Sequence, residues 1–162
     1  MLWSMFDARG RGSGTSATAQ ELGPDVLAAA RQIGRRARVG LLPMHADLAV
    51  LPVARQLVQA FEILGDSVTI LDTEAPWLTQ RSEAGVVPPA VLERALEDAC
   101  ARARRVLVAF SAGDLEGPAA SLFAALDGIL LLARPGGSSE FRLHKLLRHI
   151  DGKRALGVLL VE

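Results

Sequence analysis

The chain has 162 residues, half of them hydrophobic, and its 18 basic residues are balanced by 18 acidic residues. This length suits one compact domain, and the zero net charge provides no general attraction to nucleic acid or anionic lipid. The single cysteine, Cys100, excludes an intramolecular disulfide bond, and no apolar run reaches the roughly 18 residues of a membrane-spanning helix. No signal peptide is evident, so we expect a cytoplasmic protein that reaches a membrane only through a partner.

The first 22 residues differ in composition from the rest of the chain. Residues 1–6 read MLWSMF and are mostly apolar, whereas residues 7–20 are rich in Gly, Ser, Thr, Arg and Ala and lack apolar periodicity. We therefore predict a flexible arm with an apolar start over 1–22, followed by an α/β domain over 23–162. The alternative is that the apolar start is a start-site remnant, or a strand or clip that packs on its own domain. Candidate residues of the arm for docking on another protein are Leu2, Trp3 and Phe6.

Apolar runs alternate with helical patterns after this arm. Continuous apolar runs predict five strands, at Arg38–Leu42, Ser67–Leu71, Arg105–Phe110, Gly128–Ala133 and Leu156–Val161. Apolar residues at helical spacing, with Pro at starts and Gly after ends, predict helices over 25–36, 51–64 and 88–104, one beginning at Pro118, and one from Ser138 or Ser139 to Ile150. The segment 72–87 contains Pro76 and Gly85 and is predicted as a loop.

The strands are continuously apolar rather than alternating, which indicates that both faces of the sheet are buried. Together with the strand–helix alternation, this predicts a three-layer α/β domain. It has a five-stranded, mainly parallel sheet with helices on both faces, similar to Rossmann and P-loop NTPase folds. Ligands of such sheets bind beyond the carboxyl ends of the strands. We therefore expect the functional loops at 43–50, 72–87, 111–117 and 134–139.

The first of these loops lacks the groups that bind a phosphate. Such a loop needs glycines that let backbone N–H groups converge, a lysine for charge, and a Ser or Thr hydroxyl for magnesium. The sequence PMHADLAVLP at 43–52 has neither glycine nor lysine. Asp47 would place a negative charge beside a phosphate, and Pro52 has no N–H to offer.

The spacing of this region nevertheless resembles the opening of the MinD/ParA group of P-loop ATPases, which includes the bacterial tyrosine kinases of polysaccharide export. The family pattern is a strand, the motif KGGVGK[ST]T, a long helix ending in LG, and a strand ending in DxD. Counting back from Leu64-Gly65, the resemblance implies that His45 replaces the signature lysine and Val50 the phosphate-binding lysine. The Ser/Thr pair corresponds to Leu51-Pro52. The segment ILDTE is similar to the family's VDxD, with Glu74 as the second acid.

The second half of the chain continues the resemblance. The segment ALDGILLLARPG at 125–136 is similar to the family's ADGVILVVRxG, and LGVLLV at 156–161 is similar to LGVVLN. The acid that the family has after its next strand is missing, because Ser111 follows that strand here and Asp114 comes too late. The family's base-contacting Asn corresponds to Val161 or Glu162. The resemblance therefore implies a lineage in which nucleotide chemistry was dispensed with.

Other catalytic patterns are incomplete. His144 and His149 are five residues apart, which puts them on different faces of a helix rather than at the spacing of a zinc pair. Ser111 follows Phe110, whereas a nucleophile elbow has glycine on both sides of its serine. The acids Asp72, Glu74, Asp114 and Glu116 resemble a magnesium site of receiver domains, but the acidic pair after the first strand is missing, which favours solvated loop acids.

We therefore predict a non-enzymatic protein with no catalytic residue, cofactor or metal: a protein-binding pseudo-ATPase that acts as scaffold or regulator in a surface-polysaccharide, cell-surface or positioning system. Its partner is another protein or a second copy in a homodimer, not a nucleic acid. Candidate partner-binding residues are Leu2, Trp3, Phe6, Trp77, Arg142, Lys145 and Arg148. The degenerate nucleotide site comprises His45, Asp47, Val50, Leu51, Asp72, Glu74, Ser111 and Asp114. The alternative is a sensor or enzyme that binds a small ligand or nucleotide through the acidic loops.

Overall fold

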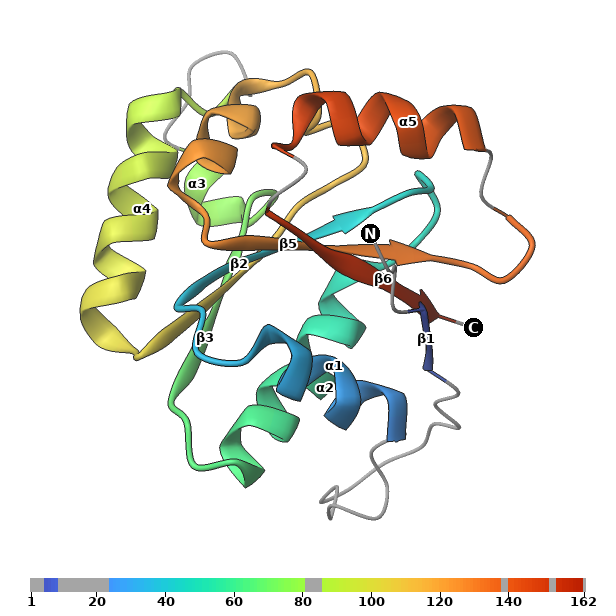
Figure 1. Cartoon of the computed structure of the whole chain (residues 1–162). Helices are drawn as coiled ribbons and strands as arrows, with labels where there is room; N and C mark the ends of the chain where they lie inside the picture. The colour runs from blue at the N-terminus through green and yellow to red at the C-terminus, as the bar shows by residue number, and fades with distance from the viewer. Residues whose placement is uncertain (1–4, 9–23, 81–85, 138–139, 152–153, 162) are drawn as a thin grey trace.

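The computed structural model describes residues 5–8, 24–80, 86–137, 140–151 and 154–161, without the side chains of 5–8, 24 and 140–142. The chain forms a parallel sheet with helices packed on both faces (Figure 1). None of the helices in these ranges combines the length and the apolarity needed to cross a bilayer.

The sheet has six strands in the order β1-β6-β5-β2-β4-β3, and every neighbouring pair is parallel. The strands are β1 (Met5–Ala8), β2 (Arg38–Pro43), β3 (Val68–Asp72), β4 (Arg105–Ala109), β5 (Gly128–Ala133) and β6 (Ala155–Val161). Strands β2 to β6 are the five predicted strands, shifted by at most one residue at either end. The predicted α/β fold with a parallel sheet is therefore confirmed.

Strand β1 lies within the segment that the composition assigned to a flexible arm. Met5 is in register with Val158 and Ala8 with Val161, so β1 extends the sheet beyond β6. This arrangement is the alternative noted above, a strand packed on its own domain. The physical reason is that β6 would otherwise present unpaired N–H and C=O groups at the sheet margin. Phe6 is thus placed on β1, whereas Leu2 and Trp3 lie outside the described residues.

Helices cover both faces of the sheet. They are α1 (Pro24–Ile33), α2 (Val50–Ile63), α3 (Pro76–Thr79), α4 (Pro89–Arg102), the 3₁₀ helix η1 (Pro118–Ala125) and α5 (Glu140–His149). Helices α1 and α2 pack on one face, and the other four pack on the opposite face (Figure 1).

One helical turn, α3, interrupts the segment predicted as a loop over 72–87, so that prediction was wrong for Pro76–Thr79. Proline at the start of a helix is already set to a helical φ. The N–H of Gln80 donates to the Pro76 carbonyl at 2.9 Å, and the fully buried Leu78 anchors the turn in the core. Trp77, between Pro76 and Leu78, is exposed on the surface.

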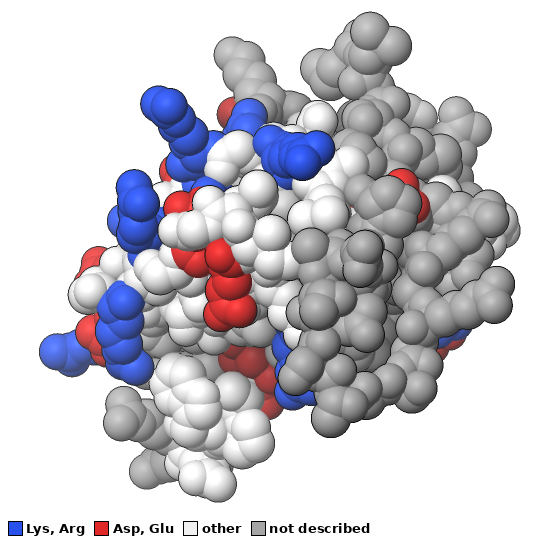
Figure 2. All heavy atoms as spheres, turned by 90° about the horizontal axis from the view of Figure 1, so that it is seen from below, with Lys and Arg blue, Asp and Glu red and all other residues white. Residues whose placement is uncertain are grey.

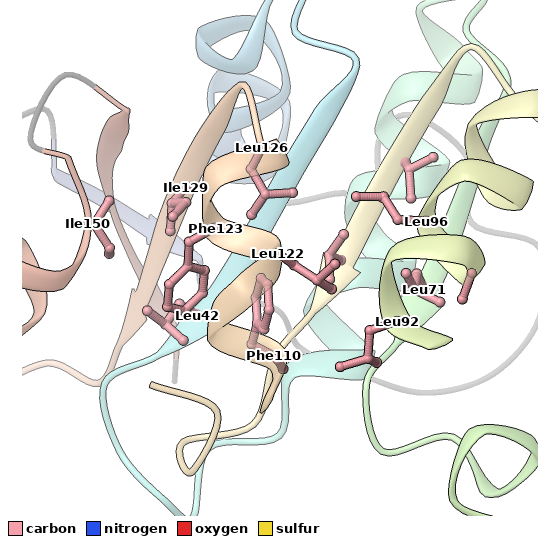
Figure 3. Close-up of a cluster of buried hydrophobic side chains, with 14 of the residues drawn as sticks. Leu42, Leu71, Leu92, Leu96, Phe110, Leu122, Phe123, Leu126, Ile129 and Ile150 are labelled. Carbon is pink, nitrogen blue, oxygen red and sulfur yellow. The ribbon is translucent and has the colours of Figure 1, made fainter. Parts of the chain in front are cut away.

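Successive side chains of the central strands enter two separate cores. On β2, Val39 and Leu41 belong to the core beneath α1 and α2, whereas Leu42 belongs to the core on the other face. Figure 3 shows this second core, in which side chains from the sheet, α4 and η1 meet. Gly40 is required there, because a Cβ at this position would lie 2.8 Å from Leu126 Cδ1 and 2.9 Å from Phe110 Cε2.

The end of α2 shapes the amino-terminal edge of the sheet. Gly65 has φ 85°, its N–H donates to Glu62 O at 3.0 Å, and the N–H of Asp66 donates to Phe61 O at 2.9 Å. These two bonds define a Schellman cap, which requires a residue that tolerates positive φ. The cap turns the chain from α2 into β3 and leaves Asp66 beside the start of β4.

Arg105, the first residue of β4, is 5% exposed and occupies this edge. Its Nη2 donates to Gly34 O at 2.7 Å and to Asp66 Oδ2 at 2.9 Å, and its Nη1 donates to the Arg36 carbonyl. The guanidinium carbon also lies 4.1 Å from the centre of the Phe61 ring. One buried cation thus joins the end of α1, the cap of α2 and the start of β4.

Candidate functional site

A pocket of about 410 Å³ lies at the carboxyl edge of the sheet. It is lined by 46–51 from the β2–α2 connection, by Asp72 and Glu74 after β3, and by 109–112 after β4. The chain runs from β2 toward β3 on one side and from β5 toward β6 on the other, so the strand order reverses here. This reversal is the position at which open parallel sheets bind ligands. Six of the eight predicted nucleotide-site residues line the pocket: Asp47, Val50, Leu51, Asp72, Glu74 and Ser111.

The start of α2 contributes the apolar residues Val50 and Leu51 to the pocket lining. Val50 is 8% exposed and packs into the core, and Leu51 is half-buried beside it. The N-cap residue Ala49 forms no side-chain cap hydrogen bond, and Pro52 carries no N–H. Because anions bind helix starts through free amides, this helix start offers fewer donors than a phosphate-binding one.

Asp47 is paired with Arg134, which directly follows β5. Arg134 Nη1 lies 2.5 Å from Asp47 Oδ2, and Arg134 Nη2 donates to the Asp47 carbonyl at 3.4 Å. Both side chains are about half exposed or more, so the pair contributes little to stability. It does link the loops after β2 and β5. Sequence reasoning missed it because the two residues are adjacent only through the β2–β5 pairing.

Asp114 joins the loops after β3 and β4. Its Oδ2 accepts the Ser111 N–H at 2.7 Å and lies 2.6 Å from Oγ1 of Thr73, a buried hydroxyl that is also 3.1 Å from Ala109 O. Asp114 does not line the pocket described above. Asp114 therefore joins Ser111, in the pocket wall, to Thr73, which directly follows β3. The sequence did not indicate this role.

His45 also lies outside the pocket lining. Its ring contacts the turn after β5, where a Cβ added to Gly137 would be 3.2 Å from His45 Nε2. This nitrogen is buried and has no hydrogen-bond partner among the described residues. His45, which the resemblance placed at the signature lysine, therefore faces the turn between β5 and α5.

The pocket lining is acidic. Asp47, Asp72 and Glu74 contribute carboxylates, and no lysine or arginine is among the described residues that line it. Asp72 Oδ1 accepts the N–H of Glu74 at 3.0 Å, which holds the two acids on one turn. Within the described part of the chain, no group of three or more His, Cys, Asp or Glu side chains could hold a metal ion. The arrangement favours cations over phosphates.

Of the predicted partner-binding residues whose side chains are described, Trp77 lies on α3, and Lys145 and Arg148 lie on α5. Trp77 is 51% exposed on α3, next to the acidic loop. Lys145 Nζ donates to Glu116 Oε1 at 2.6 Å, and this ammonium lowers the pKa of Glu116. Arg148 is exposed on the same helix, and the side chain of Arg142 lies outside the described residues. Among the predicted partner-binding residues whose side chains are described, Trp77 is the large apolar one that is exposed to solvent.

The charges on the α1/α2 face are mixed. Figure 2 shows acidic and basic side chains interspersed over the described part of this face. Surfaces that bind nucleic acid carry clustered Lys and Arg on one face. This view shows no such cluster in the described residues.

Comparison with protein-family models gives no match, and comparison with curated proteins gives none. The protein class that the fold defines is a parallel α/β domain with a pocket at the carboxyl edge of its sheet. Membership of a particular family does not follow from this fold, because the same architecture hosts many unrelated functions.

Proposed function

We propose that this chain is a non-catalytic pseudo-ATPase of the MinD/ParA type that acts by binding proteins. The observation that carries the proposal is the charge of the pocket, whose described lining has three carboxylates, of which Asp47 is paired with Arg134 and Asp72 and Glu74 have no cation in that lining. Two like charges 4 Å apart repel by about 4 kcal/mol in the effective dielectric near a protein surface. Phosphoryl transfer depends on cations that offset the charge of the transferred phosphate, and the one described cation paired with a lining residue, Arg134, is already engaged by Asp47.

The proposed setting rests on the sequence resemblance. The order of strands, caps and loops between Arg38 and Glu162 is similar to the MinD/ParA group, which includes polysaccharide-export kinases. A member without turnover can still present its folded surface to a partner. We therefore place the protein as a scaffold or regulator in a surface-polysaccharide, cell-surface or positioning system.

Titration with nucleotide tests the loss of ATP binding. We expect no saturable heat with ATP or ADP, with or without Mg²⁺, up to about 1 mM, which corresponds to a binding free energy weaker than about −4 kcal/mol. Asp72→Asn combined with Glu74→Gln is the matched variant, because it removes pocket charge and keeps side-chain size. A dissociation constant in the low micromolar range for the wild-type chain, or ATP turnover above background, would refute the proposal.

Trp77 is our candidate anchor for the protein partner. Exposed tryptophans are enriched among residues that dominate binding energy at interfaces. Trp77→Ala should leave the thermal midpoint nearly unchanged, because the ring is half exposed, and should weaken capture of the native partner at least tenfold. Affinity capture with the tagged full chain measures this effect. Leu64→Ala is the control, since Leu64 is 46% exposed at the opposite edge of the sheet; equal capture by both variants would exclude Trp77 as the anchor.

The apolar N-terminal segment is the second candidate for partner capture. Deleting residues 1–20 would also remove β1 and uncover β6, so a lost interaction could reflect a changed sheet margin. Substituting Trp3 and Phe6 by alanine in the full chain avoids that problem. The docking hypothesis fails if the substituted chain captures the partner as well as the wild type does.

The pocket volume supports one alternative. About 410 Å³ is within the range of small-molecule sites, so a sensor of a small ligand remains our second candidate. The acidic lining favours a cationic ligand over an anionic one. Titration with Mg²⁺ alone and with an organic diamine distinguishes this alternative, because the scaffold proposal expects neither to bind in a saturable manner.

A further inference from the structure

The edge of the sheet at which the strands begin exposes apolar residues. Helices α1 and α2 both end at this edge, where β2 and β3 begin (Figure 1). Ile63 and Leu64, at the end of α2, are 47% and 46% exposed. The other large apolar residues that are exposed in the described part of the chain, Trp77 and Val86, lie between β3 and α4 at the opposite edge. The amino edge therefore has accessible apolar surface of its own.

The buried guanidinium of Arg105 brings the ends of α1 and α2 together. It donates to Gly34 O at 2.7 Å and to Asp66 Oδ2 at 2.9 Å. The connection after α1 and the turn after α2 are therefore separated by the width of one guanidinium. Exposed arginines lie on both sides, with Arg35 in the connection after α1 and Arg104 immediately before β4. We define the arginine edge as the exposed residues Arg35, Arg36, Ile63, Leu64 and Arg104.

The positive charge of the arginine edge is only partly offset within the described structure. Arg105 engages the Asp66 carboxylate at 2.9 Å, and Arg104 Nη1 lies 3.9 Å from the same carboxylate. Neither Arg35 nor Glu62, an exposed acid in the last turn of α2, forms an ion pair with the described residues. The guanidinium groups of Arg35 and Arg104 therefore have donors available for a ligand.

Helix capping explains only one arginine of this edge. Arginines near the end of a helix commonly offset the partial negative charge of its last carbonyl groups. Arg36 has this role, because its Nη1 donates to Gln32 O and Ile33 O at 3.3 and 3.2 Å. Arg35 and Arg104 lie beyond the ends of α1 and α4 and donate to no helix carbonyl among the described residues.

We propose that the arginine edge binds an acidic segment of a partner protein, in which carboxylates flank an apolar side chain. Guanidinium groups match carboxylates in charge and geometry, and arginine is enriched at protein interfaces with an apolar centre. The apolar side chain of the segment covers Ile63 and Leu64, and its acids pair with Arg35 and Arg104. This ligand is distinct from the partner that Trp77 anchors at the opposite edge. The inference therefore goes beyond the proposed function and does not depend on the pocket.

The charges elsewhere on the chain favour a protein segment over a nucleic acid or an anionic membrane. The 18 basic residues of the whole chain are balanced by 18 acidic residues. Acidic and basic side chains are interspersed on the adjoining α1/α2 face (Figure 2). An extended anionic surface would meet these acids, whereas a short acidic segment contacts the arginine edge alone.

Fluorescence anisotropy of a labelled acidic peptide with the full chain tests the proposal. The probe is a short peptide that has a central leucine with Glu and Asp on both sides. We expect saturable binding with a dissociation constant of about 100 µM or lower at low salt, and weaker binding as salt rises. Arg35→Gln combined with Arg104→Gln should raise the dissociation constant at least about tenfold. Absence of saturable binding, or unchanged binding by this double variant, overturns the proposal.

Arg55→Gln combined with Arg94→Gln is the matched control. Both arginines are exposed and lie in the first halves of α2 and α4, away from the arginine edge, and the change in net charge is the same. This variant should bind the peptide as the wild type does. A loss as large as that of the Arg35/Arg104 variant would reveal a general charge effect and contradict a defined site. Both double variants change exposed residues, so their thermal midpoints should stay near the wild-type value.

Three further measurements distinguish other occupants. Tighter binding of an RNA oligonucleotide or of phosphatidylserine vesicles than of the peptide would indicate phosphate recognition and overturn the proposal. Salt-sensitive self-association without peptide binding would identify a second copy as the occupant and overturn it as well. Replacing the leucine of the probe by serine should weaken binding several-fold, and unchanged binding contradicts the contact with Ile63 and Leu64. Trp77→Ala should leave peptide binding unchanged, so this proposal and the partner-binding proposal can fail independently.

Discussion

Arg105→Ala is expected to lower the free energy of unfolding by about 3–5 kcal/mol, because it leaves a partly buried carboxylate and two carbonyl groups without their donor. The guanidinium donates to Gly34 O and Asp66 Oδ2 at 2.7 and 2.9 Å and to the Arg36 carbonyl. Its stacking on Phe61 is lost as well. Urea unfolding followed by circular dichroism measures the change in the free energy of unfolding.

Arg104→Ala is the matched control for this prediction. Arg104 is the preceding residue and contacts the same carboxylate, but at 3.9 Å and with a side chain that is 80% exposed. Exposed ion pairs contribute roughly 0–1 kcal/mol, so this variant should unfold close to the wild type. If the two variants were equally stable, the buried network around Arg105 would not hold this edge of the sheet together.

Asp114→Ala is expected to destabilise the chain by about 1–2 kcal/mol, because the Ser111 N–H loses its acceptor. The Ser111 nitrogen and Thr73 Oγ1 lie 2.7 and 2.6 Å from Asp114 Oδ2. The Thr73 hydroxyl is also 3.1 Å from Ala109 O, so it keeps an acceptor in the variant and the loss falls mainly on Ser111. Thermal or urea unfolding gives the stability change, and faster exchange of the Ser111 amide hydrogen would locate it in the pocket wall.

Two further variants are controls for the Asp114→Ala prediction. Asp114→Asn keeps one acceptor oxygen and should lose less than the alanine variant. Glu116→Ala removes an exposed acid of the same loop whose partner is the exposed Lys145, and surface substitutions of this kind usually change stability little. An Asp114→Ala chain as stable as Glu116→Ala would show that the bonds between the two loops contribute nothing.

Partner binding has a different basis from these stability effects. Trp77 stands in solvent beside the acidic pocket, whereas Arg105 and the Schellman cap lie at the opposite edge. A variant at the amino-terminal edge should therefore change unfolding without changing the pocket. This separation allows loss of function to be distinguished from loss of folding in each experiment.

The sequence alone determined strands β2 to β6, the burial of the central strands β2, β4 and β5, and the presence of a helix between successive strands from β2 to β6. These features follow from local patterns: continuous apolar runs such as Gly128–Ala133, and Gly65 at the one position after α2 that needs positive φ. The pocket acids Asp72 and Glu74 were also predicted, because the carboxyl ends of parallel strands meet at one edge.

The tertiary structure alone decided which distant residues meet. Asp47 and Arg134 are 87 residues apart, Thr73 and Asp114 are 41 apart, and Arg105 reaches Gly34 across 71 residues. Each contact depends on the order of strands in the sheet, which local periodicity does not encode. The same holds for the place of β1 beside β6, because an edge strand meets its partner only when the sheet has assembled.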